Sequence, residues 1–230
     1  MVNYLSKTEN NILLGMILGD AHIRQLKKEA RFEIGHSVKQ KDYVFWKYEK
    51  LKRWVISKPH LSRTYDSRYD KFYSKWRFRT KSHRAFTFLR KLFYPNGKKI
   101  VPKNIKSILK SPLSLAVWYM DDGGRRNDCY GLFLNTLSFT EKENLLLSKV
   151  LKNNFSVNTH IHWIQDGFRL YVPSSDSAKF CKIVNPYILN SLKYKLPFNP
   201  VTTSFAQLDR ARDRNKKSYN TSAPLFAEKL

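Results

Sequence analysis

Acidic residues are scarce in this chain. Its 230 residues include 18 Asp and Glu against 43 Lys and Arg, which gives a formal net charge of +25 at pH 7. Such a surface repels itself, and binding a polyanion relieves the repulsion; nucleic acid is the usual polyanion. The basic residues are spread over the chain rather than gathered in a tail. On charge alone, a ribosomal or other general RNA-binding protein remains an open interpretation.

Cysteine and long apolar runs are also lacking. Cys129 and Cys181 belong to no CxxC or Cys/His pattern, so neither a zinc site nor a disulfide framework is expected, and a reducing compartment fits. No run of about 18 or more apolar residues occurs, so we expect no transmembrane helix and no membrane partner. The first ten residues lack the basic start and apolar stretch of a signal peptide, and so give no reason to expect export.

The chain nevertheless has the material for a folded core. Hydrophobic residues make up 42% and aromatic residues 14% of the sequence, so wholesale disorder is not expected. The length allows one large domain or two of about 100–150 residues. The sequence therefore predicts a folded, strongly basic protein.

Two apolar stretches end in acids where helices seldom carry them. NILLGMILGDAHIR (11–24) and PLSLAVWYMDDGGR (112–125) each predict an apolar helix that stops at an acid next to small residues. A helix C-terminus carries partial negative charge, so a carboxylate there costs about 0.3–1 kcal/mol. The two acids, Asp20 and Asp122, are separated by close to half the folded chain, which predicts an internal repeat.

The segments that follow each acidic helix come in the same order: strand, helix, two strands, helix. In the first half they are predicted at 30–38, 39–56, 60–67, 71–80 and 82–94, the last with Ser82 as N-cap. In the second half they are predicted at 130–139, 140–155, 157–164, 168–172 and 176–189, with Thr140 and Glu143 forming a capping box.

These elements divide the chain into four parts. An N-terminal repeat spans 1–94, and a linker with Pro and Gly breakers spans 95–111. A C-terminal repeat spans 112–205, and a polar tail, peripheral or mobile, spans 206–230.

The strands of the first half carry basic and aromatic residues. In SKWRFRT (74–80), a period of two puts the aromatic Trp76 and Phe78 on one face and the cations Lys75, Arg77 and Arg79 on the other. In HLSRTYDS (60–67), Arg63 and Tyr65 share a face. Since β-ribbons can enter the duplex major groove, we expect this sheet to lie on nucleic acid.

The two acidic helices resemble the paired motifs of LAGLIDADG homing endonucleases, in the monomeric class with two motifs in one chain. LLGMILGDA (13–21) and LAVWYMDDG (115–123) match the nine-residue motif. Further segments, in matching order over most of 10–200, are similar to the branch whose second motif ends in MDDGG: GHSVKQKDYVFWKY (35–48), KKIVPKN (98–104), LNTLSFTEKE (134–143) and KYKLP (193–197).

This resemblance implies an α+β fold built as a pseudo-twofold tandem repeat of αββαββα units. Two curved antiparallel sheets would form a DNA-binding saddle, with the motif helices packed at the centre. Gly15 and Gly19, at i and i+4, could let another helix approach closely, whereas Val117 stands where the second motif would have glycine and leaves Ala116 as the nearest small residue. We therefore expect a less symmetric helix pair than in homodimeric relatives.

Phosphodiester cleavage needs an activated water, a stabilised leaving oxygen and a neutralised phosphate, which paired divalent metals supply. Mg²⁺ requires only a few carboxylates besides water and phosphate oxygens. The resemblance and the repeat assign Asp20 and Asp122 as catalytic acids that hold Mg²⁺ or Mn²⁺, while Ca²⁺ would occupy the site without supporting cleavage. Gly19 and Asp121 join this metal group, and the role of Asp121 stays open between an auxiliary acid, a cap and a solvated neighbour.

By resemblance, Lys99 and Lys195 match two peripheral active-site lysines that order water or offset charge in the transition state. A generic phosphate contact is the alternative for each. His36 and Ser37 are first-half candidates for the solvent network. In the second half Leu137 stands where a polar Gln is typical, which leaves two substitutes, Asn135 and Ser138.

The expected DNA-binding residues come from the strands and the segments that flank them: Arg24, His36, Ser37, Lys39, Arg63, Tyr65, Lys75, Arg77, Arg79, Arg125, Asn135, Ser138, His160, His162 and Arg169. His160 and His162 share a strand face, as a metal pair would. No third ligand stands at a recognisable spacing, so a DNA-facing or packing role is favoured and a His-metal nuclease is disfavoured.

The resemblance implies a monomeric, site-specific homing endonuclease with double-stranded DNA as its partner. It would hydrolyse both strands of a long asymmetric target with Mg²⁺, leave short 3′ overhangs and promote intron mobility from an organelle, mitochondrion or chloroplast. Two alternatives remain: a group I intron RNA maturase, with intron RNA as partner, and a nucleic-acid-binding protein that does not cleave.

Overall fold

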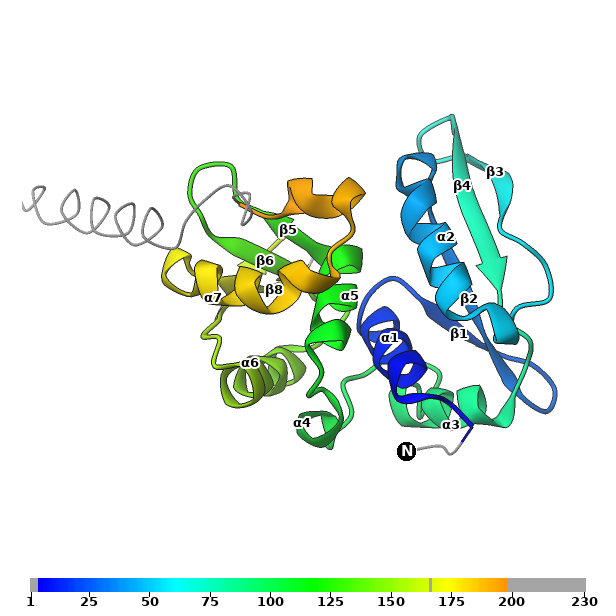
Figure 1. Cartoon of the computed structure of the whole chain (residues 1–230), viewed down its shortest axis with the longest axis horizontal. Coiled ribbons are helices and arrows are strands. Elements are labelled where there is room, and N and C mark those ends of the chain that lie inside the picture. The colour runs from blue at the N-terminus through cyan, green and yellow to red at the C-terminus, as the bar shows by residue number, and fades with distance from the viewer. Residues whose placement is uncertain (1–3, 166, 198–230) are drawn as a thin grey trace, which may run out of the picture.

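Two helices that end in acids lie side by side at the centre of the molecule, and one four-stranded antiparallel sheet stands on either side of them (Figure 1). The computed structural model describes residues 4–165 and 167–197. The predicted tail, 206–230, lies outside the described residues, as does the end of the predicted C-terminal repeat. The expected α+β fold, with the motif helices at its centre, is confirmed.

The first sheet follows the first central helix, and four helices or helical turns accompany its strands. In chain order the elements are α1 (Lys7–Leu18), β1 (His22–Gln25), β2 (Ala30–Ser37), η1 (Val38–Gln40), α2 (Lys41–Lys50), η2 (Lys52–Trp54), β3 (His60–Asp66), β4 (Lys71–Arg79) and α3 (Arg84–Phe93). A short helix, α4 (Ile105–Ile108), lies within the predicted linker.

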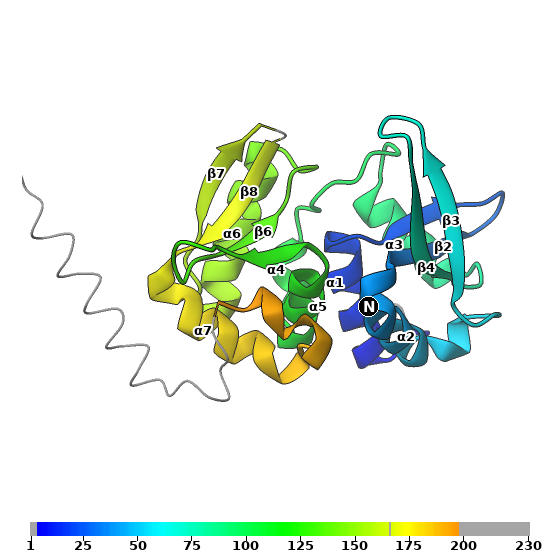
Figure 2. The ribbon, with the colours of Figure 1, turned by 90° about the horizontal axis from the view of Figure 1, so that it is seen from above.

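The second half repeats this order. Its elements are α5 (Pro112–Asp122), β5 (Gly123–Arg125), β6 (Leu132–Asn135), α6 (Glu141–Phe155), β7 (His160–Ile164), β8 (Gly167–Val172), α7 (Ser174–Val184), η3 (Asn185–Tyr187) and η4 (Asn190–Lys195). The strand orders, β1-β2-β4-β3 and β5-β6-β8-β7, correspond strand for strand. This correspondence is the internal repeat that the sequence predicts, and in the view from above the two sheets flank the α1–α5 pair (Figure 2).

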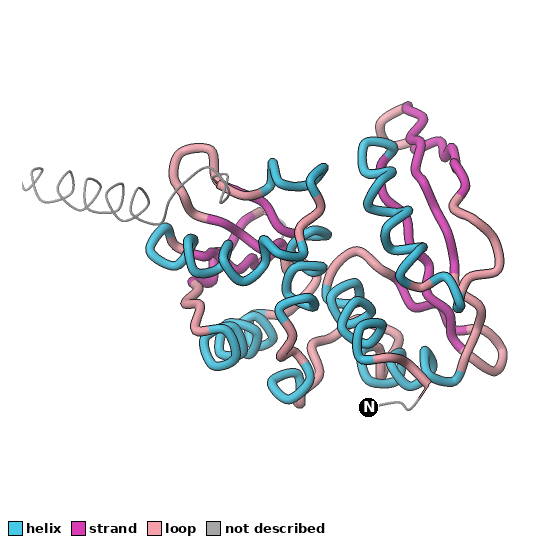
Figure 3. Tube along the Cα trace, in the orientation of Figure 1, coloured by secondary structure: helices cyan, strands magenta, loops and turns pink. Residues whose placement is uncertain are grey.

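Helices cover one face of each sheet, so the strands have a buried and an open side (Figure 3). In β2 the buried residues alternate with more exposed ones, as the period of two requires. The aromatic side of β4 is the covered side: Phe78 is buried and Trp76 packs against the core, while Lys75, Arg77 and Arg79 are exposed. The predicted division of this strand into an aromatic and a cationic face is confirmed.

The two central helices approach closely at Gly15. A Cβ atom added there would lie 2.5 Å from the carbonyl oxygen of Ser114 and 2.7 Å from the Cβ of Val117. Glycine is therefore needed on α1 where valine faces it on α5. The residues that meet at this contact thus differ between the two helices, glycine on α1 and valine on α5.

Side-chain caps begin several helices. Ser6 and Glu9 form a capping box on α1, and the predicted box of Thr140 and Glu143 begins α6. The prediction of Ser82 as the cap of α3 is wrong by one residue: the side chain of His83 accepts from the main-chain N–H of Ala85. An imidazole nitrogen takes the acceptor role that a hydroxyl was expected to fill.

Several predicted boundaries differ from the observed ones. The strand predicted at 130–139 is only β6, because 136–139 turn toward α6, and the last helix starts earlier than predicted and ends at Val184. The short strands β1 and β5, which follow the motif acids, were not predicted. Among the described residues, no helix combines the length and apolar character needed to cross a membrane.

Candidate functional site

The C-terminal ends of α1 and α5 meet, and each brings one acid. Asp20 follows the C-cap Gly19 of α1, whereas Asp122 is the last residue of α5. A Cβ added to Gly19 would lie 2.5 Å from the Cβ of Asp121, so only glycine permits this approach. The main-chain N–H of Asp20 donates to Oδ2 of Asp121 at 3.3 Å, which joins the two helix ends directly.

The acids at this junction repel one another. Burial raises the pKa of Asp122 to about 8, and the charges of Asp20 and Asp121 add to the rise. Lys99 and Lys195 oppose it. Bringing carboxylates together disfavours their ionised forms unless a cation joins them, so this donor set fits a hard divalent ion.

Two lysines lie against the ends of the motif helices. Nζ of Lys99 donates to the carbonyl oxygen of Gly19 at 2.6 Å, and Nζ of Lys195 donates to the carbonyl oxygens of Met120 at 2.6 Å and Asp121 at 3.0 Å. Burial lowers the pKa of both lysines, and the neighbouring aspartates oppose that shift. The structure thus brings both predicted lysines to the junction that holds Asp20 and Asp122.

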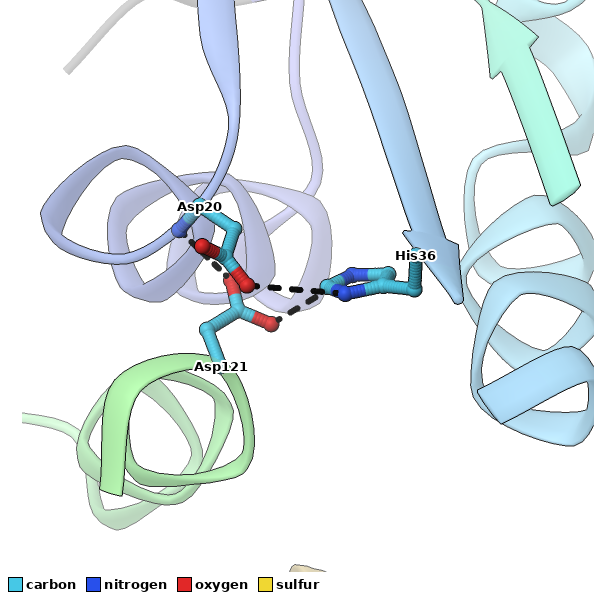
Figure 4. Close-up of side chains that lie close together, drawn as sticks. All are labelled: Asp20, His36 and Asp121. Atoms are coloured by element: carbon cyan, nitrogen blue, oxygen red, sulfur yellow. Dashed lines mark hydrogen bonds and ion pairs between the residues drawn. The ribbon is translucent and has the colours of Figure 1, made fainter. Parts of the chain in front are cut away.

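The carboxylate of Asp121 is fully buried and contacts other protein groups. Figure 4 shows its contacts with Asp20 and His36. Its Oδ1 lies 2.6 Å from Nζ of Lys47, a lysine of α2 with no exposed side-chain surface. Its Oδ2 accepts the N–H of Asp20. Of the three roles left open for Asp121, the solvated neighbour is therefore excluded. Its side chain instead makes hydrogen bonds to residues of the other half.

His36 lies inside the protein rather than on the open side of the sheet. Its side chain is 3% exposed, with Nδ1 3.5 Å from Oδ2 of Asp20 and Nε2 3.7 Å from Oδ1 of Asp121 (Figure 4). Burial, followed by the charge of Lys47, lowers its pKa to about 3, so the imidazole is neutral. Its expected role as a DNA-binding side chain is wrong in placement, because the alternation along β2 turns residue 36 toward the helices.

One group of three side chains has the spacing of metal ligands. Single ligand atoms of Asp20, His36 and Asp121 all lie within 4.8 Å of one another. The ammonium of Lys47 already lies on the two buried members, at 2.6 Å from Asp121 and 2.8 Å from Nε2 of His36. A cation is therefore present at the buried side of this group, and the oxygens left for a metal are those of the exposed Asp20 and of Asp122.

The open face of the first sheet carries most of the basic residues predicted there. Strand pairing puts the following on that face: Arg24, Ser37, Lys75, Arg77 and Arg79, with the exposed Lys39 just beyond β2. Arg63 and Tyr65 pair with Ser74 and Phe72, on the opposite face. There Arg63 lies over the ring of Phe72 and Tyr65 donates to Asp70, so these two predicted DNA-binding residues lie on the other face of the sheet from Lys75, Arg77 and Arg79.

The second sheet has a corresponding open face. Asn135 pairs with Arg169, which pairs with His162, and His160 pairs with Tyr171. The rings of His162 and Tyr171 stack with centroids 4.7 Å apart, so the two histidines flank a tyrosine. Ser138 is exposed in the loop after β6.

Arg125 departs from the expectation. It pairs with the buried Leu132, which puts it on the helix side of the sheet, and its charge acts on Tyr119 of α5. The next residue, Arg126, lies over the ring of Tyr171 on the open face. Arg126 lies as many residues after Asp122 as Arg24 lies after Asp20. This spacing in the sequence would have predicted Arg126, rather than Arg125, as the counterpart of Arg24.

Lys47 was also missed, and its sequence context gives little signal. It lies in KDYVFWKYEK, an amphipathic helix with two other lysines, where a lysine is normally solvated. Its position in register with the buried Tyr43, Val44 and Tyr48 was the available clue. Only the structure reveals the buried acid that it contacts.

Paired acids between two repeats, with lysines beside them and two open basic sheet faces, define a nucleic-acid-binding protein with a centre suited to divalent cations. The model of the LAGLIDADG DNA endonuclease family matches residues 10–180. The chain belongs to this family, and the resemblance of its two motifs is confirmed.

Known relatives agree with this membership. The chain is 34% identical over 200 residues to "Probable intron-encoded endonuclease 1" of Wickerhamomyces canadensis, covering 85% of this chain and 86% of that protein. It is 29% identical over 196 residues to "Cytochrome b mRNA maturase bI2" of Debaryomyces hansenii, covering 84% and 74%.

Solved structures give the same result. The homing endonuclease I-WcaI, solved bound to its DNA recognition sequence, is 33% identical with a TM-score of 0.79, over 85% of this chain and 88% of that one. The LAGLIDADG meganuclease I-AabMI, solved with uncleaved DNA, is 14% identical with a TM-score of 0.52, over 91% and 92%, and supports the fold alone.

Proposed function

We propose that this protein is a site-specific homing endonuclease that hydrolyses both strands of a long, asymmetric DNA target and leaves short 3′ overhangs, so promoting intron mobility. The observation that carries the proposal is the meeting of the ends of α1 and α5, which bring Asp20 and Asp122 to one junction, where burial and then the charge of Asp20 raise the pKa of Asp122. A similar chain, I-WcaI, is a homing endonuclease bound to its DNA recognition sequence.

Asp20 and Asp122 would hold Mg²⁺ or Mn²⁺, with the carbonyl groups of Gly19 and Asp121 nearby. The bound cations supply an activated water and stabilise the leaving oxygen. Ca²⁺, a larger ion with looser geometry, would bind without supporting cleavage. A bound cation would favour the ionised form of Asp122, whose pKa is otherwise raised by burial.

Lys99 and Lys195 would contact the phosphates on either side of this centre. An ammonium has three N–H donors, and the bond of Lys99 to Gly19 uses one of them. A fixed cation beside the scissile phosphate stabilises charge that develops in the transition state. Because the lysines are held by main-chain carbonyls at the same junction as the acids, they need not reorient when DNA binds.

The two open sheet faces would each read one half-site. The first presents Lys75, Arg77 and Arg79, whereas the second presents Asn135 and Arg169 with its histidines. Different side chains on the two faces require different half-sites, so the target is asymmetric and the protein acts as a monomer.

A plasmid-cleavage assay tests the proposal. Supercoiled plasmids carrying the intron-insertion junction are incubated with the protein in Mg²⁺, Mn²⁺, Ca²⁺ or EDTA, and the ends are sequenced. We expect linear product with 3′ overhangs in Mg²⁺ or Mn²⁺ only. Asp20→Asn and Asp122→Asn should bind the junction and leave it intact; near-normal cutting by either variant would refute the catalytic assignment.

A maturase activity is the second candidate, favoured by the similarity to a cytochrome b mRNA maturase. It would use intron RNA as partner, in the organelle where such an intron is transcribed. Splicing of the host group I intron RNA, with and without the protein, measures it directly. Splicing assistance by the Asp122→Asn variant would show that the two activities use different groups.

A further inference from the structure

Lys47 is a lysine with 0% of its side chain exposed. It belongs to α2 of the first half, yet its Nζ lies 2.6 Å from Oδ1 of Asp121, on α5 of the second half. The same ammonium lies 2.8 Å from Nε2 of His36 and over the ring of Tyr43, 4.1 Å from its centroid. Burying an ammonium is strongly unfavourable unless it is paired, so these contacts account for its position.

Both polar partners of Lys47 lead to Asp20. Oδ2 of Asp121 accepts the main-chain N–H of Asp20 at 3.3 Å. Because the ammonium donates to Nε2 of His36, the imidazole carries its own proton on Nδ1, which lies 3.5 Å from Oδ2 of Asp20. Asp121 thus fixes the main chain of Asp20, and His36 lies beside the carboxylate of Asp20.

Asp20 needs such support more than Asp122 does. Asp122 is the last residue of α5, so the helix fixes its backbone. Asp20 lies beyond the C-cap of α1, after a glycine, and its side chain is 47% exposed. The contacts of Lys47 therefore reach the one motif acid that its own helix does not hold.

The second half lacks this arrangement. Matching the strand pairs β1–β2 and β5–β6 and the first residues of α2 and α6 puts the buried Leu147 in the place of Lys47, and the motifs put Gly19 in the place of Asp121. A leucine is therefore sufficient for the packing of this helix against its sheet, and packing does not require a lysine there. Within the part of the chain that the structure describes, this buried ammonium and carboxylate pair once across the interface between the halves.

We propose that Lys47 is a positioning residue, which acts through Asp121 and His36 to hold Asp20 in the orientation that metal binding and cleavage require. It touches neither DNA nor the reacting atoms. The part of this proposal that concerns cleavage rests on the proposed function, and the part that concerns the orientation of Asp20 does not.

The decisive variant replaces the ion pair with apolar side chains of similar size, Lys47→Met with Asp121→Leu. Such replacements of buried pairs commonly preserve stability, whereas Lys47→Met alone strands a buried carboxylate. We expect the double variant to melt within about 3 °C of the unsubstituted protein. The matched control is Lys50→Met, which removes the same charge from an exposed position of the same helix.

Hydrogen exchange reports on the orientation of Asp20 without any substrate. In the double variant the Asp20 amide should exchange about tenfold faster, while amides within α1 and α5 keep their protection. An unchanged Asp20 amide in a folded double variant overturns the proposal, whether or not the protein cleaves DNA.

Single-turnover cleavage then separates positioning from stability. We expect the double variant to bind target DNA in EDTA as the unsubstituted protein does, but to cleave about 10–100-fold more slowly and to need more Mg²⁺ for its half-maximal rate. Cleavage at the normal rate with the normal Mg²⁺ dependence would mean that the pair is structural only, and overturns the proposal. If the Lys47→Met, Asp121→Leu variant does not fold, a second double variant, Lys47→Met with Asp121→Asn, replaces both charges with side chains of similar shape. A normal cleavage rate in that variant would also overturn the proposal. Failure of the unsubstituted protein to cleave would instead refute the proposed function, leaving the exchange result to decide on positioning.

Discussion

The ammonium of Lys99 lies 2.6 Å from the carbonyl oxygen of Gly19, at the C-terminal end of α1. Lys195 makes the corresponding contact at the end of α5, 2.6 Å from the carbonyl oxygen of Met120. A cation is favourable at this pole of a helix, where a carboxylate is not. The two lysines thus offset the unfavourable position of the motif acids.

Replacing either lysine should slow chemistry more than binding. We expect Lys99→Met and Lys195→Met each to lower the single-turnover cleavage rate about 10²-fold, because each removes a fixed donor beside the scissile phosphate. Lys98→Met is the matched control, since Lys98 is exposed and adjacent in sequence. A variant that binds more weakly but cleaves at the normal rate once saturated would identify its lysine as a simple phosphate contact.

Gly15→Ala should destabilise the fold. The added Cβ meets the carbonyl oxygen of Ser114 and the Cβ of Val117 at distances no native contact shows, so the helices must separate. Overpacking of this kind costs about 1–3 kcal/mol in the free energy of unfolding. Urea denaturation measures it, and Lys7→Ala on the exposed side of α1 should change that free energy by less than about 0.5 kcal/mol.

The two faces of the first sheet should differ in their contribution to DNA binding. Arg77→Ala removes a cation from the open face and should weaken binding by about 1–3 kcal/mol, with a shallower dependence on salt. Arg63→Ala removes the same charge from the opposite face and should have little effect. Fluorescence anisotropy from 50 to 200 mM salt compares them, and equal losses would contradict the face assignment.

Glu9 should make stability depend on pH. Burial raises the pKa of its carboxyl, but hydrogen bonds from Arg53, the Ser6 main chain and Trp54 outweigh this and leave the pKa below its ordinary value of 4.5. A lowered folded-state pKa means that the stabilisation is complete above about pH 5 and is lost as the pH falls through the folded-state value.

Glu9→Gln should therefore lower the free energy of unfolding by about 1–3 kcal/mol at pH 7, and by much less in acid. Thermal unfolding of the variant and the unsubstituted protein at pH 7 and in acid measures the difference. Glu49→Gln serves as control, because the Glu49–Lys52 pair is exposed at both ends. A constant difference between the two proteins at all pH values would show that the charge of Glu9 is not responsible.

The central helices, the long strands and the capped helix α6 could be predicted from the sequence. Each of them has several residues in a regular pattern that identifies the type of element. The strands β1 and β5 have four and three residues, too few for alternation to show, and they continue directly from the motif segments. The opposite orientation of Arg63 on β3 and Arg77 on β4 was not predicted, for another reason. Pairing register, which a single strand does not reveal, decides that Arg63 faces away from Arg77.

The acids and lysines of the site were placed by motif resemblance, whereas the contacts among them were not. Lys47 and Asp121 are far apart in sequence and lie on elements whose relative placement depends on how the two halves dock. No local pattern encodes that docking. A buried lysine in an amphipathic helix is recognisable only once its acid is known.

The contact between Lys47 and Asp121 also limits how the chain could be rebuilt. Two copies of the first half, assembled as a symmetric dimer, would bring each Lys47 toward Gly19 of the other copy. Glycine has no carboxylate with which the ammonium could pair. Each buried ammonium left without its acid would cost roughly 3–5 kcal/mol. This cost disfavours pairing of the first half with a copy of itself. A chimera that joins it to a second half from a relative must bring an acid at position 121 to remain folded.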